Sequence, residues 1–357
     1  MPKVTVLMTV YNGERHLREA IEGVLRQTFQ DFEFLIINDG SSDSTREVTL
    51  SYRDPRIRLV NNEHNLGQTR SLNRGLELAK GQFIARQDAD DISEPERLAR
   101  QVAFLETHAE VALLGTWYKK IDAQGNPLGD RKLPCDCMDI RWSLLFFCPF
   151  VHSSVMLRKS AILEQIGFYD ETFAYAQDYE LWSRIARRLA VANLGEFLVK
   201  YRTTPWSMTS TYGVRVNDEI LRISTANICH LLGADEAKRI MNSVAHFNNV
   251  SLLLFGSHGS LRSAEAIKAA CAVLRLHTSF CQYYGNSRND CRTHRAALCS
   301  HMGRRIVDIA LCKFNQNNLA ASQVVRQAFR LHWPIVLANR IAWLYFSCLR
   351  ATSVREN

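Results

Sequence analysis

The sequence contains no apolar run long enough to cross a membrane. A membrane-spanning helix needs roughly 18 or more consecutive apolar residues with few or no charges, and every apolar stretch of this chain ends sooner. The N-terminus is also unlike a signal peptide, because its apolar run, Val4–Val10, is short, alternates and is followed at once by a polar loop. Both absences predict a cytoplasmic protein without a membrane span.

Cysteine-based scaffolds are missing too. Seven of the ten cysteines lie beyond Gly213, and their spacings, as at Cys271, Cys281, Cys291 and Cys299, are too wide for a CxxC zinc site. A disulfide framework is not expected in a chain of this length without a secretion signal, so we expect reduced thiols. Internal repeats and low-complexity segments are absent from the sequence, and 357 residues allow one large domain or two ordinary ones.

The basic excess of the chain is confined to its last part. The net charge is +8, and beyond Gly213 there are 18 Lys and Arg against 8 Asp and Glu, whereas the preceding part is nearly neutral. A basic module can meet nucleic acid, anionic lipid or an anionic substrate, or can simply be a solvated helical surface.

The first part of the sequence alternates strand and helix patterns. Short apolar runs alternate with longer segments whose apolar residues recur at helical spacing. This alternation is typical of a parallel sheet covered by helices. The expected strands are Val4–Val10, Phe32–Ile37, Ile57–Val60 and Phe83–Arg86, and the expected helices are Gly13–Gln27, Ser44–Tyr52, Gln68–Lys80 and Pro95–His108.

The pattern changes near Gly213, where helical periods replace strand alternation. The predicted fold class is therefore α/β, with a mostly parallel, Rossmann-like sheet, helices on both faces and a mainly helical C-terminal region. We expect two domains, residues 1–213 and 214–357. The further expected elements of the first domain are strands at Val111–Trp117, Ser153–Leu157 and Phe197–Tyr201 and a helix at Asp178–Leu189.

An acidic cluster follows the fourth expected strand, at Asp88, Asp90 and Asp91. Ligands of such sheets bind beyond the carboxyl ends of the strands. Carboxylates this close repel one another, so a functional site for them needs a cation, and hard oxygen ligands suit Mg²⁺ or Mn²⁺. The competing interpretation is a solvated loop whose acidic residues stabilise the N-terminus of the next helix.

Two further carboxylates stand at places where a ligand could bind. Asp39 follows the second strand, and its carboxylate could accept a hydrogen bond from a nucleobase, although the same string of residues also forms ordinary turns. Asp178 precedes an amphipathic helix, where a plain N-cap is the simpler role.

Taken together, these motifs resemble the family 2 glycosyltransferases, which have the GT-A fold. The resemblance covers about residues 2–205 and depends on the order and spacing of seven short motifs. They are Thr9-Val10-Tyr11-Asn12, Asn38-Asp39-Gly40-Ser41-Ser42-Asp43, His64-Asn65-Leu66-Gly67, Asn73-Arg74-Gly75, Ala85-Arg86-Gln87-Asp88-Ala89-Asp90-Asp91, Pro95-Glu96-Arg97 and Gln177-Asp178.

The resemblance implies an inverting, metal-dependent glycosyltransferase of the hexosyltransferase type that uses a nucleoside-diphosphate sugar, with UDP as the expected nucleotide. It implies that Asp39 holds the base in a pocket lined by Thr9, Tyr11 and Asn12. Asp88 and Asp90 would form the acidic motif for Mn²⁺ or Mg²⁺, with Asp90 as the direct metal ligand and Asp88 also facing the donor. Asp178 would be the catalytic base.

Two positions depart from the pattern of the family. Processive members have a Gln-x-x-Arg-Trp motif after the base, and the segment Leu181–Ile185 lacks it, which favours a non-processive enzyme. Many relatives have a His where this chain has Thr204, so another group must replace it. His152 is one candidate, and a satisfied loop or core histidine is the simpler interpretation of that residue.

Acceptor and location follow only from the resemblance and the basic tail. We expect a saccharide or lipid-linked acceptor in cell-surface polysaccharide or lipopolysaccharide synthesis, and no nucleic-acid partner. Pro334–Arg350 reads as an amphipathic helix that could lie on the inner face of the cell membrane or pack on the protein. The competing functions are a nucleotidyltransferase, disfavoured because no Gly-rich phosphate loop follows the first strand, and a non-catalytic sugar-nucleotide-binding or scaffold protein.

Overall fold

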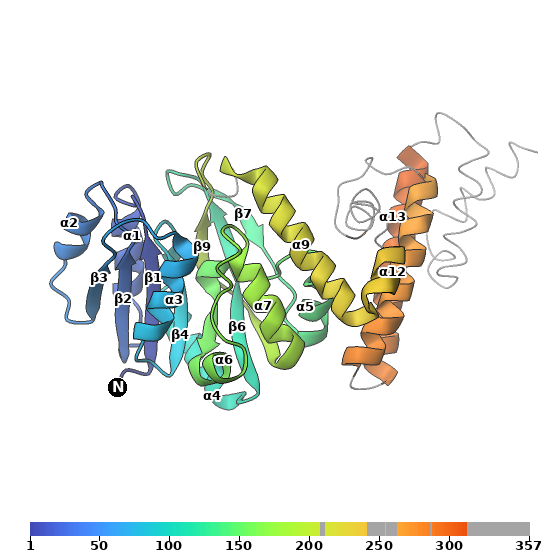
Figure 1. Ribbon diagram of the computed structural model, residues 1–357, viewed down its shortest axis with the longest axis horizontal. Coiled ribbons are helices and arrows are strands. Elements are labelled where there is room, and N and C mark those ends of the chain that lie inside the picture. Colours follow the sequence, from blue (N-terminus) through green and yellow to red (C-terminus); the bar gives the residue numbers. More distant parts are fainter. Residues whose placement is uncertain (208–210, 241–253, 255–262, 286–287, 313–357) are drawn as a thin grey trace, which may run out of the picture. The chain divides into compact units, whose positions relative to one another are not determined.

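The computed structural model describes residues 1–207, 211–240, 254, 263–285 and 288–312 (Figure 1). The chain divides into two compact units, Met1–Ser224 and Thr225–Asn357, and the division falls inside a long helix, α9 (Gly213–Leu232). Beyond α9, the described elements are all helical, as the sequence predicts for this region: α10 (Ala234–Ile240), α12 (Ser263–Tyr284) and α13 (Arg288–Cys312). The tail at Pro334–Arg350 lies outside the described residues.

Four parallel strands form the first half of the sheet in unit 1. Their order is β3-β2-β1-β4, and the bounds are β1 (Val4–Val10), β2 (Phe32–Asn38), β3 (Ile57–Asn61) and β4 (Phe83–Asp88). The four strands expected from apolar runs are therefore all present. Since β1 lies between β2 and β4, with Thr9 beside both Ile37 and Asp88, the ends of these three strands meet at one edge.

The second half of the sheet is mixed in direction. β8 (Met156–Arg158) runs antiparallel between β4 and β6 (Val111–Ile121), β6 is parallel to β9 (Ala190–Arg202), and β9 also pairs with the short β5 (Ile92–Ser93). The remaining strand, β7 (Pro127–Arg131), pairs with β6. The α/β class is confirmed, but parallel pairing predominates only in the first half. The strand expected at Ser153–Leu157 starts later because His152–Ser154 form a 3₁₀ turn.

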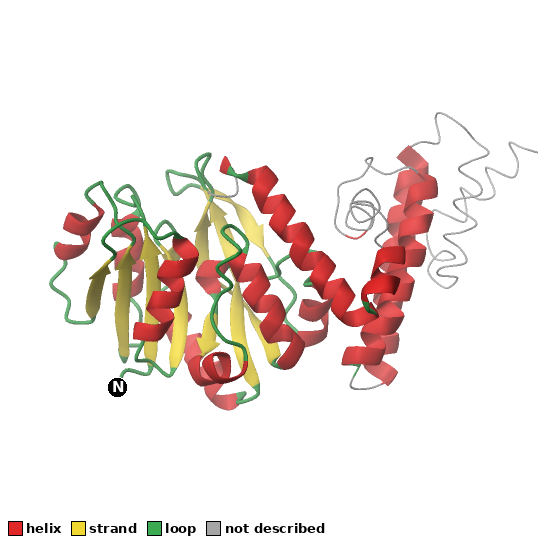
Figure 2. Ribbon diagram, in the orientation of Figure 1, coloured by secondary structure: helices red, strands yellow, loops and turns green. Residues whose placement is uncertain are grey.

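Helices cover both faces of the sheet (Figure 2). The alternation of side chains along β1 explains the arrangement, because Val6 and Met8 join one buried cluster with Ile21 and Leu98, whereas Leu7 joins the opposite cluster. The first face carries α1 (Leu17–Leu25) and α4 (Arg97–Thr107), and the second carries α3 (Gln68–Leu78) and α7 (Gln177–Arg188). The short helices are α2 (Thr45–Leu50), α5 (Cys137–Ser143) and α6 (Lys159–Gln165).

Two properties of the described residues bear on the predictions from composition. None of their helices combines the length and apolar character needed to span a bilayer. The eight cysteines for which the structure gives a state are all free thiols.

Candidate active site

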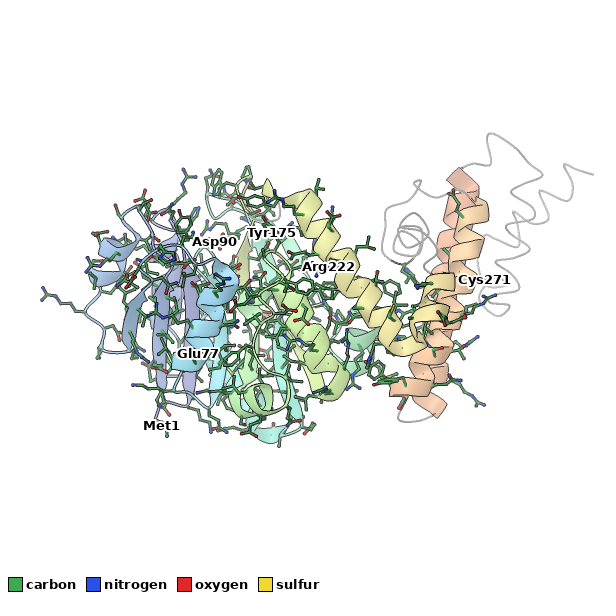
Figure 3. The ribbon with its side chains drawn as sticks, in the orientation of Figure 1. Met1, Glu77, Asp90, Tyr175, Arg222 and Cys271 are labelled. Carbon is green, nitrogen blue, oxygen red and sulfur yellow. The ribbon has the colours of Figure 1, made fainter. Side chains whose placement is uncertain are left out.

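The candidate site lies at the edge where β1, β2 and β4 end. The Asp39 backbone N–H donates to the Val10 carbonyl over 2.8 Å, so the loop after β2 stays beside the end of β1. Thr9 is buried at this edge, and its hydroxyl lies 3.4 Å from the Arg86 guanidinium. The structure thus brings three of the residues expected from the motifs, Thr9, Asp39 and Asp88, to one edge of the sheet. Figure 3 shows Asp90 in the same region.

Asp39 organises the loop that leads into α3. Its side chain is only 3% exposed. One carboxylate oxygen accepts from the Asn62 side-chain amide at 2.6 Å and from the Leu66 backbone N–H at 2.9 Å, and the other accepts from the Gly67 N–H at 3.0 Å. Gly67 has a φ of +90°, which an L side chain rarely adopts. The backbone of the His64–Gly67 motif therefore serves to bind the Asp39 carboxylate, which accounts for the place of this motif in the sequence.

Tyr11 and Asn12 occupy the loop after β1 and differ in their surroundings. Asn12 has a positive φ of 50° and links the two loops, because its backbone N–H donates to Ser41 Oγ and its side-chain oxygen accepts from the Ser42 N–H, both at 2.9 Å. Tyr11 is 51% exposed and is available to contact a ligand.

Asp88 is held by a cation and a hydroxyl. The buried Arg86 guanidinium donates to one carboxylate oxygen at 2.5 Å, and Ser153 Oγ donates to the other at 2.8 Å. Burial alone would raise the pKa of Asp88, but the nearby charges, chiefly that of Arg86, hold this pKa below its usual value. Asp88 is therefore ionised and already paired.

Asp91 is buried and links the acidic cluster to β9 by a hydrogen bond. One of its oxygens accepts from the Arg202 backbone N–H at 2.7 Å, and the other is hydrogen-bonded to Ser153 Oγ. Burial, reinforced by the charges of Asp90 and Asp88, raises the pKa of Asp91 well above its usual value. With both oxygens in use and only 1% of the residue exposed, Asp91 holds the framework together and is not accessible to a ligand.

Asp90 is the carboxylate of the cluster that stays open. It is partly exposed, and no other residue in the described part of the chain donates a hydrogen bond to its carboxylate. Burial, followed by the charge of Asp88, raises the pKa of Asp90 to about 6. A carboxylate that is desolvated and lacks a partner gains most from a cation.

Asp178 lies in the first turn of α7 but does not cap it as the simpler interpretation required. The N-cap position is Ala176, which has no side-chain cap, and the Asp178 carboxylate accepts from the Tyr179 N–H at 2.7 Å. Burial is the largest influence on its pKa, which rises to about 6, and the charge of Asp88 adds to the increase. The charges of Asp88 and Arg86 both act on this pKa, so Asp178 lies within electrostatic reach of the acidic cluster.

His152 packs behind the acidic cluster. Its Nε2 accepts from the Arg86 Nε–H at 3.2 Å, and its ring lies edge-on to Trp182. Burial, followed by the charge of Arg86, lowers the pKa of His152 to about 3. His152 is therefore neutral, and its Nε2 lone pair is directed at Arg86. Thr204, at the place of the family histidine, is buried just beyond β9.

The motifs gave no individual role to four residues that support this site: Arg86, Ser153, Arg202 and Glu219. Arg86 could have been found from sequence, since it stands two positions before Asp88 in a motif already noted. Ser153 and Arg202 come from distant segments and meet the cluster only in three dimensions, and Glu219 contacts the backbone just before Asp178. Arg202, for example, donates from its guanidinium to the Asp90 carbonyl at 2.8 Å and to Glu19 at 2.9 Å.

An α/β sheet with helices on both faces and an acidic, partly open edge is the class of fold in which ligands bind beyond the carboxyl ends of the strands. Residues 5–167 match the family model described as glycosyl transferase family 2. The chain is also 32% identical over 269 residues to an uncharacterized glycosyltransferase of Haemophilus influenzae, covering 71% of this chain and 80% of that relative. The protein belongs to glycosyl transferase family 2.

Other similar proteins include the amylovoran biosynthesis glycosyltransferase AmsE of Erwinia amylovora, 35% identical over 56% of this chain and 75% of AmsE. Among solved structures, S. aureus TarS 1-349 with UDP-GlcNAc has a TM-score of 0.55 at 16% identity, covering 88% of this chain and 91% of that one. The mannosyltransferase PcManGT of Pyrobaculum calidifontis, with GDP-Man and Mn²⁺, has a TM-score of 0.50 at 16% identity, covering 88% of each chain. At this identity the structures support the fold alone.

The first prediction concerns Asp39. Because its carboxylate accepts three internal hydrogen bonds, Asp39→Asn should turn an amide N–H toward a backbone donor and reduce the free energy of unfolding by about 1–3 kcal/mol, even without nucleotide. Thermal and urea unfolding of the ligand-free protein measure this. The exposed Asp31→Asn is the control. An unchanged stability for Asp39→Asn would mean that the three hydrogen bonds do not hold this loop.

Proposed function

We propose that this protein is an inverting, non-processive, metal-dependent glycosyltransferase of the GT-A type. It transfers a sugar from a nucleoside-diphosphate sugar, with UDP as the nucleotide, to an acceptor hydroxyl in cell-surface polysaccharide or lipopolysaccharide synthesis. The observation that carries the proposal is the pair Asp90 and Asp178. Both are partly buried carboxylates with pKa values raised to about 6, and neither forms an ion pair with a described residue.

The donor nucleotide is proposed to bind at the ends of β1 and β2. Thr9, Tyr11 and Asn12 line the base pocket, and Asp39 keeps the loop Asn62–Gly67 in shape while one of its oxygens meets the base edge. Asp39 Oδ2 accepts a single hydrogen bond here, so one lone pair is left for a base N–H. The UDP-GlcNAc bound in TarS supports the choice of UDP.

The residues present fit a divalent cation. Among the described residues no ready-made group of three or more metal-ligating side chains exists, but Mg²⁺ and Mn²⁺ sites of this kind use one or two carboxylates and complete their shell with phosphates and water. Asp90 is proposed as the direct ligand, because Asp88 is already engaged by Arg86 and Ser153. When bound, the cation would offset the charge of the departing diphosphate. The Mn²⁺ in PcManGT supports this assignment.

Asp178 is proposed as the general base. Its carboxylate takes the proton of the acceptor hydroxyl as that oxygen attacks the anomeric carbon from the face opposite the leaving diphosphate, which inverts the anomeric centre. A pKa near 6 leaves the group ionised at neutral pH and makes it a better proton acceptor than an ordinary aspartate. Its second oxygen is free of the Tyr179 N–H and is available to the acceptor.

The cation assignment predicts the behaviour of Asp90→Asn. Wild-type protein with Mn²⁺ is offered UDP-GlcNAc, UDP-glucose, UDP-galactose and GDP-mannose, and thermal shift and nucleoside-diphosphate release identify the donor. Asp90→Asn should then abolish turnover and remove the Mn²⁺-dependent part of the thermal shift, while the ligand-free melting temperature changes little. The exposed Asp130→Asn serves as the control. Undiminished Mn²⁺-stimulated turnover in Asp90→Asn would exclude it as a ligand.

The base assignment predicts a pH profile and a variant. Turnover should rise with pH through an apparent pKa of about 6, because only the ionised Asp178 accepts a proton. Asp178→Asn keeps the side-chain shape and should reduce turnover on the order of 10²–10⁴-fold with donor affinity within a few-fold of wild type. Normal turnover in a folded Asp178→Asn protein would rule out the base. Donor binding without turnover in the wild type would instead favour a non-catalytic sugar-nucleotide-binding protein.

The acceptor is proposed to be a saccharide or lipid-linked hydroxyl, and the location a peripheral one on the inner face of the cell membrane. The polysaccharide role of AmsE supports the first part, and the sequence of the tail supports the second. At low salt the full chain should float with liposomes that contain anionic lipid, and high salt should release part of it. Removing residues 334–357 should reduce flotation and leave donor hydrolysis intact. Full-length protein that stays unbound at low salt contradicts the membrane proposal.

A further inference from the structure

A buried glutamate on α9 holds the backbone just before the proposed base. Glu219 is 8% exposed. Its Oε1 accepts from the Ala174 N–H at 2.9 Å, and its Oε2 accepts from the N–H groups of Tyr175 at 2.9 Å and Ala176 at 2.7 Å. We propose that Glu219 is a positioning residue that sets the place of the Asp178 carboxylate, an inference that rests on the proposed function of Asp178.

Glu219 accepts from the N–H of the N-cap residue of α7, Ala176, and from the two N–H groups before it. The first N–H groups of a helix lack partners within the helix, and the N-cap of α7 is Ala176, whose side chain cannot accept a hydrogen bond. Glu219 supplies the acceptor from another helix and brings negative charge to a helix N-terminus, where it is favourable. Asp178, whose carboxylate accepts from the Tyr179 N–H of the first turn, stands two residues beyond the clamp.

The clamped segment is also fixed from its other side. The Phe173 carbonyl accepts from Thr69 Oγ1 of α3 at 2.8 Å, so the backbone is held through its carbonyl by α3 and through three consecutive N–H groups by α9. With both sets of backbone groups engaged, residues 173–176 have little freedom to shift. The position of the first turn of α7 follows from these two anchors.

α9 is itself attached firmly enough to act as the anchor. Ser224 Oγ lies 3.0 Å from the Tyr179 hydroxyl, which also donates to the Leu144 carbonyl at 2.8 Å. The Arg222 guanidinium lies 4.6 Å from the centre of the Phe173 ring. Figure 3 shows Arg222 and Tyr175 along this part of the fold. The helix that carries Glu219 therefore packs on both the clamped segment and α7.

Glu219 acts on the location of the base, whereas other groups set its charge state. The pKa of Asp178 follows from its burial, the Tyr179 N–H and the charges of Asp88 and Arg86. Loosening the clamp should therefore lower the rate at every pH, while the profile keeps the same apparent midpoint. A displacement of about 1 Å in a catalytic group can cost on the order of 10² in rate.

Glu219→Gln tests the proposal, because glutamine preserves the shape but offers one acceptor oxygen where three N–H groups need two. Asp218→Asn is the matched control, since it removes the same charge from the neighbouring exposed position of α9. The first readout is hydrogen–deuterium exchange of the full chain over residues 174–179. Exchange there should rise in Glu219→Gln and stay at the wild-type level in Asp218→Asn. Unchanged exchange in Glu219→Gln overturns the clamp, whatever the activity of the protein.

The second readout is kinetic, with the donor identified by the nucleotide-sugar panel and water in place of the acceptor. Glu219→Gln should lower kcat for nucleoside-diphosphate release on the order of 10²-fold, with donor KM within a few-fold of wild type and the midpoint of the pH profile unchanged. In an Asp178→Asn background the same substitution should cost almost nothing more, because the two residues act as a unit.

The two hypotheses fail in different ways. If Glu219→Gln and Asp178→Asn reduce the rate independently, or if donor KM rises and kcat does not fall, Glu219 is not a positioning residue for the base. If Asp178→Asn is fully active, the proposed role of Asp178 fails, and the exchange experiment still decides whether Glu219 clamps residues 174–176. A mere loss of global stability would increase exchange throughout unit 1 and would contradict the local role.

Discussion

The buried guanidinium of Arg86 is the interaction on which the carboxylate edge depends. Three aspartates within four residues would repel one another, and the desolvation of each would add to the cost. Arg86 offsets this by pairing with Asp88, and it is held in turn by the Leu7 carbonyl at 3.0 Å and by His152. Removing one partner of such a pair would leave an uncompensated charge, which is costly in a protein interior.

Around this cation the carboxylates have separate tasks. Asp88 is paired with Arg86. Both oxygens of Asp91 are engaged in hydrogen bonds, one with the Arg202 N–H and the other with Ser153 Oγ. Asp90 and Asp178 are left without a charged partner among the described residues, and burial raises the pKa of each to about 6. A raised pKa alone does not distinguish these two groups, because burial also raises the pKa of Asp91. Unlike Asp91, each of them keeps at least one carboxylate oxygen that accepts no hydrogen bond from another described residue. The structure thus distinguishes the supporting carboxylates from the reactive candidates, although all lie in similar sequence contexts.

The local pattern of apolar residues was enough to predict the strands of the first half of the sheet, but not all of those in the second half. β1, β2 and β4 are rich in apolar residues and buried on both faces, and this composition is visible in the sequence. The two-residue β5 and the fully exposed β7 carry no such signal, and the start of β8 is displaced by the 3₁₀ turn that places Ser153 on Asp88. The motifs identified the carboxylates at this edge, but only tertiary contacts separate Asp90, which is open, from Asp91, which is enclosed.

The contacts that lie beyond the reach of local pattern come from β9 and α9. Arg202 at the end of β9 holds Asp91 and the Asp90 carbonyl, and Glu219 in α9 holds the segment before Asp178. Both partners lie more than 40 residues from the groups they fix, so no window of sequence around either aspartate reveals them. The proposed cation ligand and the proposed base are thereby supported by β9 and α9, which follow one another along the chain. This ties the two proposed halves of the site to the same C-terminal portion of unit 1. The inverting transfer proposed above needs the leaving group and the attacking hydroxyl on opposite faces of one sugar, and common support of the two carboxylates would keep that line of attack aligned.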